Sequence, residues 1–113
     1  MFSSDRRFSV YSYSVSHGRL LLRSGKSNKC ATRIDILFHD VRGMEIRSWF
    51  DGIEITEESP KLLENFASNP SILLELGNKV YSLKGVGWNG YVLGGILRTH
   101  EDDGEFFGPS SLL

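Results

Sequence analysis

Short runs in which apolar and polar residues alternate make up most of this chain of 113 residues. In the run TRIDILFHDV, for example, Ile34, Ile36 and Phe38 occupy every second position. Because successive side chains of a strand point to opposite faces, this period of two predicts a β-strand with one buried face. Similar runs recur along the chain, separated by turn-forming Gly, Asn and Asp residues. The pattern as a whole predicts antiparallel hairpins.

The pair His17-Gly18 predicts the first tight turn. A hairpin loop of two residues fixes which side chains of the flanking strands lie opposite one another. In this case Val15 would lie opposite Leu20, and the hairpin would have one apolar and one mostly polar face. The apolar face would carry Tyr11, Tyr13, Val15, Leu20 and Leu22, and the mostly polar face Arg19, Leu21 and Arg23.

The pair Asp51-Gly52 predicts a second two-residue turn, because Asp-Gly suits the positive φ angles of a type I′ hairpin. Phe50 would then lie opposite Ile53. The face that points away from these apolar residues would hold Glu45, Arg47, Trp49, Glu54, Thr56 and Glu58. Further turns are predicted at Gly77-Asn78, Asn89-Gly90 and Asp103-Gly104.

One short helix is predicted near Pro60–Ala67. Ser59 can cap its N-terminus, proline suits the first helical position, and Asn69-Pro70 ends it. A helix of this length is marginal in water by itself, so it needs support from the sheet. The residues expected to dock on the sheet are Leu62, Leu63 and Phe66.

These elements predict one β-rich domain over residues 1–113, since the length suits a single domain. We expect an all-β or β-rich α+β fold. About eight antiparallel strands in meander order would form a sandwich or a barrel, with the short helix packed against it.

The charge balance narrows the choice of partners. Thirteen basic residues and 14 acidic residues give a formal net charge of -1. Domains that bind nucleic acids usually carry a basic excess, so no nucleic-acid partner is expected. No apolar run approaches the roughly 20 residues of a membrane-spanning helix, and the first residues do not resemble a secretory signal. The sequence therefore predicts no membrane association and a cytoplasmic location.

Few residues are arranged for metal or cofactor chemistry. Cys30 is the single cysteine, and the three histidines lack the spacing of metal ligands, so we expect no metal site. Residues 85–90 match the pattern G-x-G-x-x-G. The strand-like run YVLGGILRT follows them, whereas a dinucleotide site needs a helix there. We interpret this segment as a glycine-rich hairpin and expect no cofactor.

No catalytic set stands out either, and the sequence favours a protein without enzymatic activity. Asp35 and His39 share one face of the predicted strand, but four residues of strand span roughly 13 Å. A hydrogen-bond partner for either side chain would have to come from another strand. We interpret their shared face as a solvated polar surface with Leu37 partly covered.

The best candidate contact surface is the polar face of the predicted Asp51-Gly52 hairpin. Trp49 and Arg47 lie on it, and both residue types are enriched at binding hot spots. Glu54 would lie opposite Trp49. Trp88 is a second candidate anchor, next to the predicted Asn89-Gly90 turn. The alternative for both tryptophans is that another element covers them and they belong to the core.

Three runs, YSVSHGRLLLRS, RIDILFHDVRGMEI and WFDGIEI, resemble segments of small uncharacterised bacterial proteins of similar length. That resemblance covers about half of the chain and implies no known activity, so it assigns no functional residue. In size and in lacking a catalytic set, the chain is also similar to bacterial immunity proteins, which block a partner toxin by binding it. This second likeness is an analogy of general properties and not of sequence motifs.

Three functions follow as hypotheses. The first is a binding module of the cytoplasm that recognises a protein partner through Arg47, Trp49, Glu54 and Trp88. The second is a small-molecule-binding protein or small enzyme with a pocket at a barrel mouth, where His17, His39, Asp35, Tyr11 or Tyr13 would converge. The third is a structural subunit that forms a homodimer through edge strands.

Overall fold

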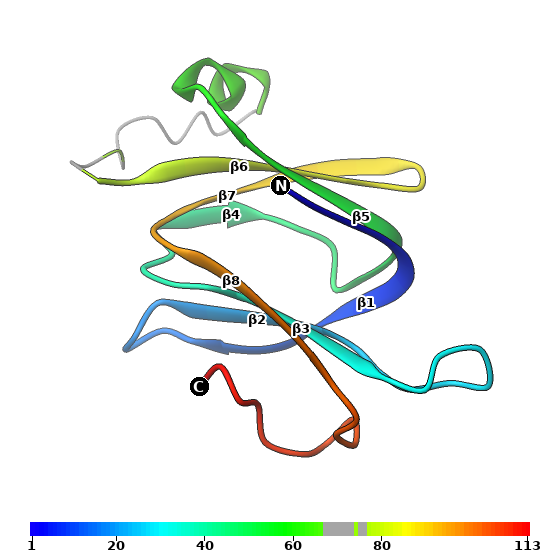
Figure 1. The fold of residues 1–113 in the computed structure, drawn as a ribbon. Coiled ribbons are helices and arrows are strands. Elements are labelled where there is room, and N and C mark those ends of the chain that lie inside the picture. Colours follow the sequence, from blue (N-terminus) through cyan, green and yellow to red (C-terminus); the bar gives the residue numbers. More distant parts are fainter. Residues whose placement is uncertain (67–73, 75–76) are drawn as a thin grey trace.

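The computed structural model describes residues 1–66, 74 and 77–113, and within them it contains eight β-strands and one 3₁₀-helix. The strands form a single antiparallel sheet in the order β4-β7-β6-β5-β1-β2-β3-β8 (Figure 1). This confirms the predicted all-β meander, although the sheet is not closed into a barrel. The strands are β1 (Phe2–Ser14), β2 (Arg19–Ser24), β3 (Arg33–Phe38), β4 (Gly43–Glu45), β5 (Trp49–Glu58), β6 (Lys79–Gly85), β7 (Trp88–Gly94) and β8 (Leu97–Asp102), and the helix is η1 (Pro60–Asn65).

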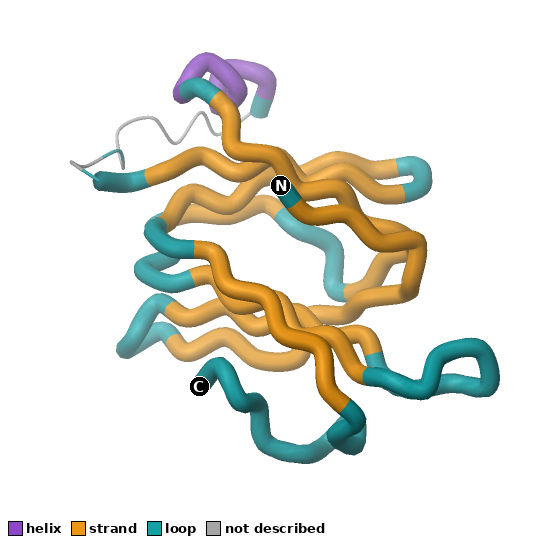
Figure 2. Tube along the Cα trace, viewed as in Figure 1, coloured by secondary structure: helices purple, strands orange, loops and turns teal. Residues whose placement is uncertain are grey.

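Strand β1, which has 13 residues, joins the two halves of the sheet. Its first half pairs with β5 and its second half with β2. Irregularities in register between Ser4 and Arg7, and between Val10 and Ser12, interrupt the two ladders. Such bulges bend a strand and increase its twist, and the sheet curves around an interior (Figure 2). The main core lies there and contains Phe8, Leu20, Leu22, Ile34, Ile36, Phe38, Val41, Phe50, Ile53, Ile55, Tyr81, Leu83 and Val92.

The connections β3–β4 and β7–β8 join the two ends of this curved sheet. Backbone hydrogen bonds run from the amide of His39 to the carbonyl of Ile96 (2.9 Å) and from the amide of Gly95 to the carbonyl of His39 (2.8 Å). The phenol of Tyr81 donates to the Gly95 carbonyl at 2.7 Å. The two connections therefore lie side by side and hold the halves of the sheet around the core.

Two smaller clusters cover the outer surface of the sheet. Helix η1 covers β6 and β7, where Leu63 and Phe66 are buried and the Phe66 ring meets the ring of Tyr91 at 4.6 Å. This confirms the predicted docking of the helix, while Ala67 lies outside the described residues. On the other half, residues 103–113, which we name the C-terminal strap, pass over β2 and β3 (Figure 1). Leu112 of the strap packs on Leu21 and Leu37.

The prediction for the first hairpin is wrong in its register. Its turn has four residues, Val15 to Gly18, so that Tyr13 lies opposite Leu20 and the Val15 side chain is 81% exposed. A two-residue type I′ turn needs positive φ at both positions. Gly18 has φ 59°, but His17 does not adopt a positive φ. The longer turn also lets the Gly18 carbonyl accept a hydrogen bond from Val41 (2.8 Å).

The predicted turn at Asp51-Gly52 is absent, since both residues lie inside the continuous strand β5. Gly52 has φ 74° and lies opposite the register irregularity of β1, where the paired strands bend together. Phe50 pairs with Phe8 of β1 rather than with Ile53, and both Phe50 and Ile53 are buried. Burial of two apolar residues against a distant strand outweighs the local turn preference of Asp-Gly.

The glycine-rich segment 85–90 is a hairpin, as predicted, but its turn falls three residues earlier than expected. Gly85 pairs with Trp88, so Val86 and Gly87 form the turn and Asn89-Gly90 belongs to β7. At Gly90 a Cβ atom would come 2.1 Å from the carbonyl oxygen of Glu45, so close approach of β4 requires glycine there.

The remaining two turn predictions have different outcomes. The strand expected before Gly77-Asn78 falls mostly outside the described residues, so that hairpin is not assessed. At Asp103-Gly104 the chain does turn after β8, and the Gly104 amide donates to the Asp102 carboxylate at 2.9 Å. The segment that follows is the strap rather than the expected strand. Among the described residues, no helix is long and apolar enough to span a membrane.

Candidate functional site

An exposed tryptophan held between charged side chains is the most distinctive surface feature. Trp49 begins β5 and is 47% exposed. The guanidinium carbon of Arg7 lies 4.6 Å from the centroid of its ring, and that of Arg47 lies 5.7 Å away. Arg7 also forms a two-point ion pair with Asp51, with N–O distances of 2.7 and 3.2 Å. We name Arg7, Arg47, Trp49 and Asp51 the tryptophan cluster.

The opposite charges of Arg7 and Asp51 stabilise the ionised form of each side chain. The hydrogen bond from Arg7 lowers the pKa of the Asp51 carboxyl below its ordinary value, and the positive charges of Arg7 and Arg47 act in the same direction. The same hydrogen bond raises the pKa of Arg7. Asp51 is therefore a carboxylate at neutral pH and holds the Arg7 guanidinium beside the indole. This arrangement presents an exposed aromatic ring whose orientation is supported by the neighbouring guanidinium groups.

The structure brings together only two of the four residues predicted for this surface. Arg47 and Trp49 are neighbours in space, as expected. Glu54 is exposed, but it pairs with Lys84 of β6 and with Ser3 of β1, beyond the bend at Gly52. Because the Asp51-Gly52 hairpin does not form, the expectation that Glu54 faces Trp49 is wrong.

Trp88 belongs to the edge of the main core rather than to the exposed cluster. It is half-buried, and its ring centroid lies 4.6 Å from that of Phe50. Its indole nitrogen is buried and has no hydrogen-bond partner among the described residues. The indole lies over Gly85, where a Cβ atom would come 2.2 Å from that nitrogen. Of the two tryptophans, Trp49 offers the larger free surface.

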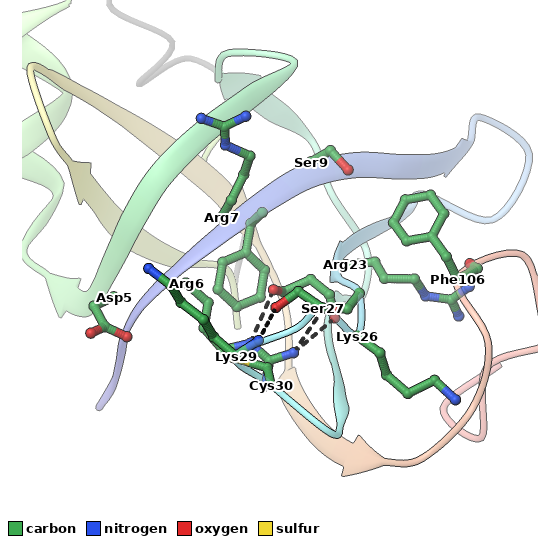
Figure 3. A pocket seen from close by; sticks show the side chains of 13 residues that line it. Asp5, Arg6, Arg7, Ser9, Arg23, Lys26, Ser27, Lys29, Cys30 and Phe106 are labelled. Atoms are coloured by element: carbon green, nitrogen blue, oxygen red, sulfur yellow. Dashed lines mark hydrogen bonds between the residues drawn. The ribbon is translucent and has the colours of Figure 1, made fainter.

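A pocket of about 820 Å³ adjoins the tryptophan cluster (Figure 3). It lies between β1 and the loop that joins β2 to β3, and Arg7 belongs to both the pocket and the cluster. Arg6 fixes the loop, since its guanidinium donates to the carbonyl of Gly25 at 3.1 Å and to the side chain and carbonyl of Thr32. The amide and carbonyl of Ser27 bond to those of Cys30, which closes the tip of the loop.

The residues predicted to converge at a barrel mouth do not line either hollow found in the structure. Neither this pocket nor a shallower one beside Gly52 is lined by His17, His39, Asp35, Tyr11 or Tyr13. In the part of the chain that the structure describes, no group of three or more His, Cys, Asp or Glu side chains gathers as metal ligands do. Cys30 is a free, half-buried cysteine on the pocket wall.

The expected solvated face of β3 is in fact a buried ionic layer beneath the strap. Arg23 and Asp35 have side-chain exposures of 0% and 1%, and they form two hydrogen bonds of 2.7 and 3.1 Å. Arg23 also donates to the carbonyls of Phe106 and Gly108 of the strap, and its guanidinium lies 4.0 Å from the ring centroid of Tyr11. The partner of Asp35 thus comes from another strand. The solvated interpretation of this face is wrong because the strap covers it.

A second arginine fastens the strap in the same way. Arg33 donates to both carboxylate oxygens of Asp102 at 3.0 Å. It also donates to the strap carbonyls of Glu105, Gly108 and Pro109 at 2.8, 3.3 and 3.0 Å. The hydrogen bonds from Arg33, and then from the Gly104 amide, lower the pKa of Asp102. Arg23 and Arg33 therefore hold the strap mainly through its backbone.

Sequence reasoning missed Arg7, Arg23 and Arg33, and only one of them left a usable signal. Arg7 lies on β1, more than 40 residues before Trp49 in the sequence. The long-range pairing of β1 with β5 brings Arg7 beside Asp51 and Trp49. Arg23 and Asp35 carry opposite charges and lie within strongly apolar runs on adjacent strands, where they pair with each other. That pattern is the signal that could have predicted a cross-strand ion pair.

Comparison with known proteins gives no significant match to a protein family, a curated protein or a solved structure. The resemblance to small bacterial proteins thus gains no support from these comparisons.

Acid should weaken the attachment of the strap, because Asp102 has a lowered pKa in the folded state. Its ordinary value is 3.8. As pH falls through and below that value, the unfolded chain binds a proton more readily than the folded one, so the free energy of unfolding decreases. Urea unfolding across this pH range should show a smaller decrease for Asp102→Asn than for the wild type. Asp103→Asn, at the exposed neighbouring residue, should behave as the wild type. The expectation would be contradicted if the free energy of unfolding of Asp102→Asn fell with pH as steeply as that of the wild type.

Proposed function

We propose that this protein is a non-enzymatic binding module that recognises a protein partner through the tryptophan cluster. The observation that carries the proposal is the exposure of Trp49 together with its fixed position between Arg7 and Arg47. Large aromatic and arginine side chains supply most of the binding energy at many protein interfaces. A ring that is already oriented loses less conformational entropy on binding.

The chemistry of the cluster indicates what the partner presents. The indole edge offers apolar contact, while Arg47 offers a guanidinium group that can bind a carboxylate in a two-point geometry. A partner with an apolar side chain flanked by acidic residues fits both features. We include a cytoplasmic location in the proposal, since the single cysteine forms no internal disulfide and thus suits a reducing compartment.

The test is affinity capture from an extract of the native cells with immobilised wild-type protein, Trp49→Ala and a matched control. Ile96→Ala is a suitable control because Ile96 is also apolar and 63% exposed, and it lies in the β7–β8 connection. We expect the wild type and Ile96→Ala to capture the same protein and Trp49→Ala to lose it. Titration calorimetry with the purified partner should then show an affinity loss of about 30-fold for Trp49→Ala, which corresponds to about 2 kcal/mol.

Two outcomes would contradict the proposal. One is capture of the same protein by Trp49→Ala at wild-type level. The other is the absence of any protein that the wild type retains more strongly than Trp49→Ala. Light scattering on the pure protein separates a different partner from a second copy, because a cluster that pairs with itself would give a dimer that Trp49→Ala dissociates.

A further inference from the structure

The pocket beside the tryptophan cluster has its own chemistry, which the proposed function does not use. Its volume of about 820 Å³ falls in the range of small-molecule sites, roughly 300–1,000 Å³. The side chains that point around it come from β1, from the β2–β3 loop and from the strap (Figure 3). Three separate parts of the chain thus meet at one hollow, whose shape depends on the complete fold.

Cationic side chains outnumber carboxylates in the lining of this pocket, which includes Asp5 and five cations: Arg6, Arg7, Arg23, Lys26 and Lys29. Four of the five are paired with carboxylates, Arg6 with Glu101, Arg7 with Asp51, Arg23 with Asp35 and Lys26 with Glu105. Among the described residues no ion pair of Lys29 is found, so its charge is available to a ligand of the opposite sign.

These cations divide into two kinds. Arg6 and Arg23 are engaged with the chain itself, since Arg6 holds the β2–β3 loop and Arg23 holds Asp35 and the strap. They form the rigid wall. Arg7 is held by Asp51 in the tryptophan cluster, and its guanidinium points away from Lys26 and Lys29 (Figure 3). Lys26 is bonded at 2.7 Å to Glu105, whose side chain is 82% exposed, and at 3.0 Å to the carbonyl of Asp103. Exposed ion pairs contribute little to stability, so an incoming anion can replace the Glu105 carboxylate at small cost.

Lys29 completes the site. It is exposed, and none of the ion pairs or hydrogen bonds found among the described residues uses its ammonium group. The hydrogen bonds between Ser27 and Cys30 fix the backbone on both sides of it. Phe106 of the strap, half-buried and opposite this loop, adds an apolar wall.

We propose that this pocket binds a small organic anion. Its carboxylate or phosphate group would be held by Lys29 and Lys26, and its apolar body would rest against Phe106. Two flexible lysines beside one apolar wall select a molecule with a charged end and an apolar end.

The test uses phenyl phosphate as the probe, with amide chemical shifts of the ¹⁵N-labelled full chain as the readout at constant ionic strength. Two further probes are benzylammonium, which keeps the ring but carries positive charge, and inorganic phosphate, which lacks the ring. We expect saturable shifts in residues 24–30 and around Phe106 with phenyl phosphate, weaker binding of inorganic phosphate and none of benzylammonium. Lys29→Glu should weaken phenyl phosphate roughly tenfold or more.

Lys61→Glu is the matched control, because Lys61 is exposed on η1 and does not line the pocket. It makes the same charge change and should keep wild-type affinity. The proposal is overturned if phenyl phosphate causes no saturable shift, if Lys61→Glu weakens binding as much as Lys29→Glu, or if benzylammonium binds equally well. Equal affinity for inorganic and phenyl phosphate would overturn the assignment of an organic ligand.

Discussion

Replacing Asp35 with alanine should lower the free energy of unfolding by about 3–5 kcal/mol, because it leaves the charge of Arg23 buried without its counter-ion. Both side chains are fully buried, and the Arg23 guanidinium lies beneath the strap and beside the Tyr11 ring. Asp35 also raises the pKa of Arg23 against the opposing effect of burial, which is the larger single influence. Arginine therefore stays charged in either case, and the cost appears as lost stability.

Urea unfolding measures this effect, with Asp5→Ala as the control because Asp5 is an exposed carboxylate. The control should change the free energy of unfolding by less than about 0.5 kcal/mol. A second variant, Arg23→Met combined with Asp35→Leu, removes both charges and should recover part of the loss. A change below about 1 kcal/mol in Asp35→Ala would show that water reaches Arg23 and would contradict the buried ionic layer.

Phe50→Ala should cost about 3–5 kcal/mol, the amount typical of a large aromatic residue removed from a core. Phe50 is 1% exposed and lies between Phe8, at a ring distance of 6.4 Å, and Trp88, at 4.6 Å. Its position also distinguishes the observed strand from the hairpin that Asp51-Gly52 suggests. Within the strand, Phe50 holds β1 and β5 together and supports the indole of Trp88.

Thermal and urea unfolding check this expectation, and Phe107→Ala is the matched control because Phe107 is 86% exposed. The control should remain within about 0.5 kcal/mol of the wild type. Phe50→Ala should also change the fluorescence of Trp88, which can be recorded alone in a Trp49→Phe background. Equal stability of the two phenylalanine variants would show that Phe50 does not lie in the core.

The sequence predicts the strands of this fold better than their pairing. Ile34, Ile36 and Phe38 lie on one strand and face the core, because their spacing reflects a local geometric rule. The Asp51-Gly52 turn fails because the pairing of Phe50 with Phe8 joins segments 42 residues apart, which no local pattern encodes. A turn preference of this kind is weak beside the burial of two aromatic rings.

In the candidate site, too, the local association could be predicted from the sequence and the long-range contacts could not. Arg47 and Trp49 are neighbours in sequence, and their association could be predicted. Arg7 could not, since it depends on the register of β1 against β5. The burial of Arg23 and Asp35 could not be predicted from the sequence for a different reason. The strap that covers them has no regular pattern, and it binds mostly through carbonyl groups that every residue possesses.

The separations along the chain within the ionic layer have a consequence for the order of folding. Arg23 and Asp35 are 12 residues apart in a simple hairpin, whereas Arg23 and Gly108 are 85 residues apart. Closing a short loop loses less chain entropy than closing a long one, so we expect the β2–β3 hairpin to form first, with its charges still hydrated. Water would leave the two charges only when β8 has paired and the strap arrives. Until that last step the hairpin would keep a charged, hydrated outer surface, which opposes aggregation of the partly folded chain.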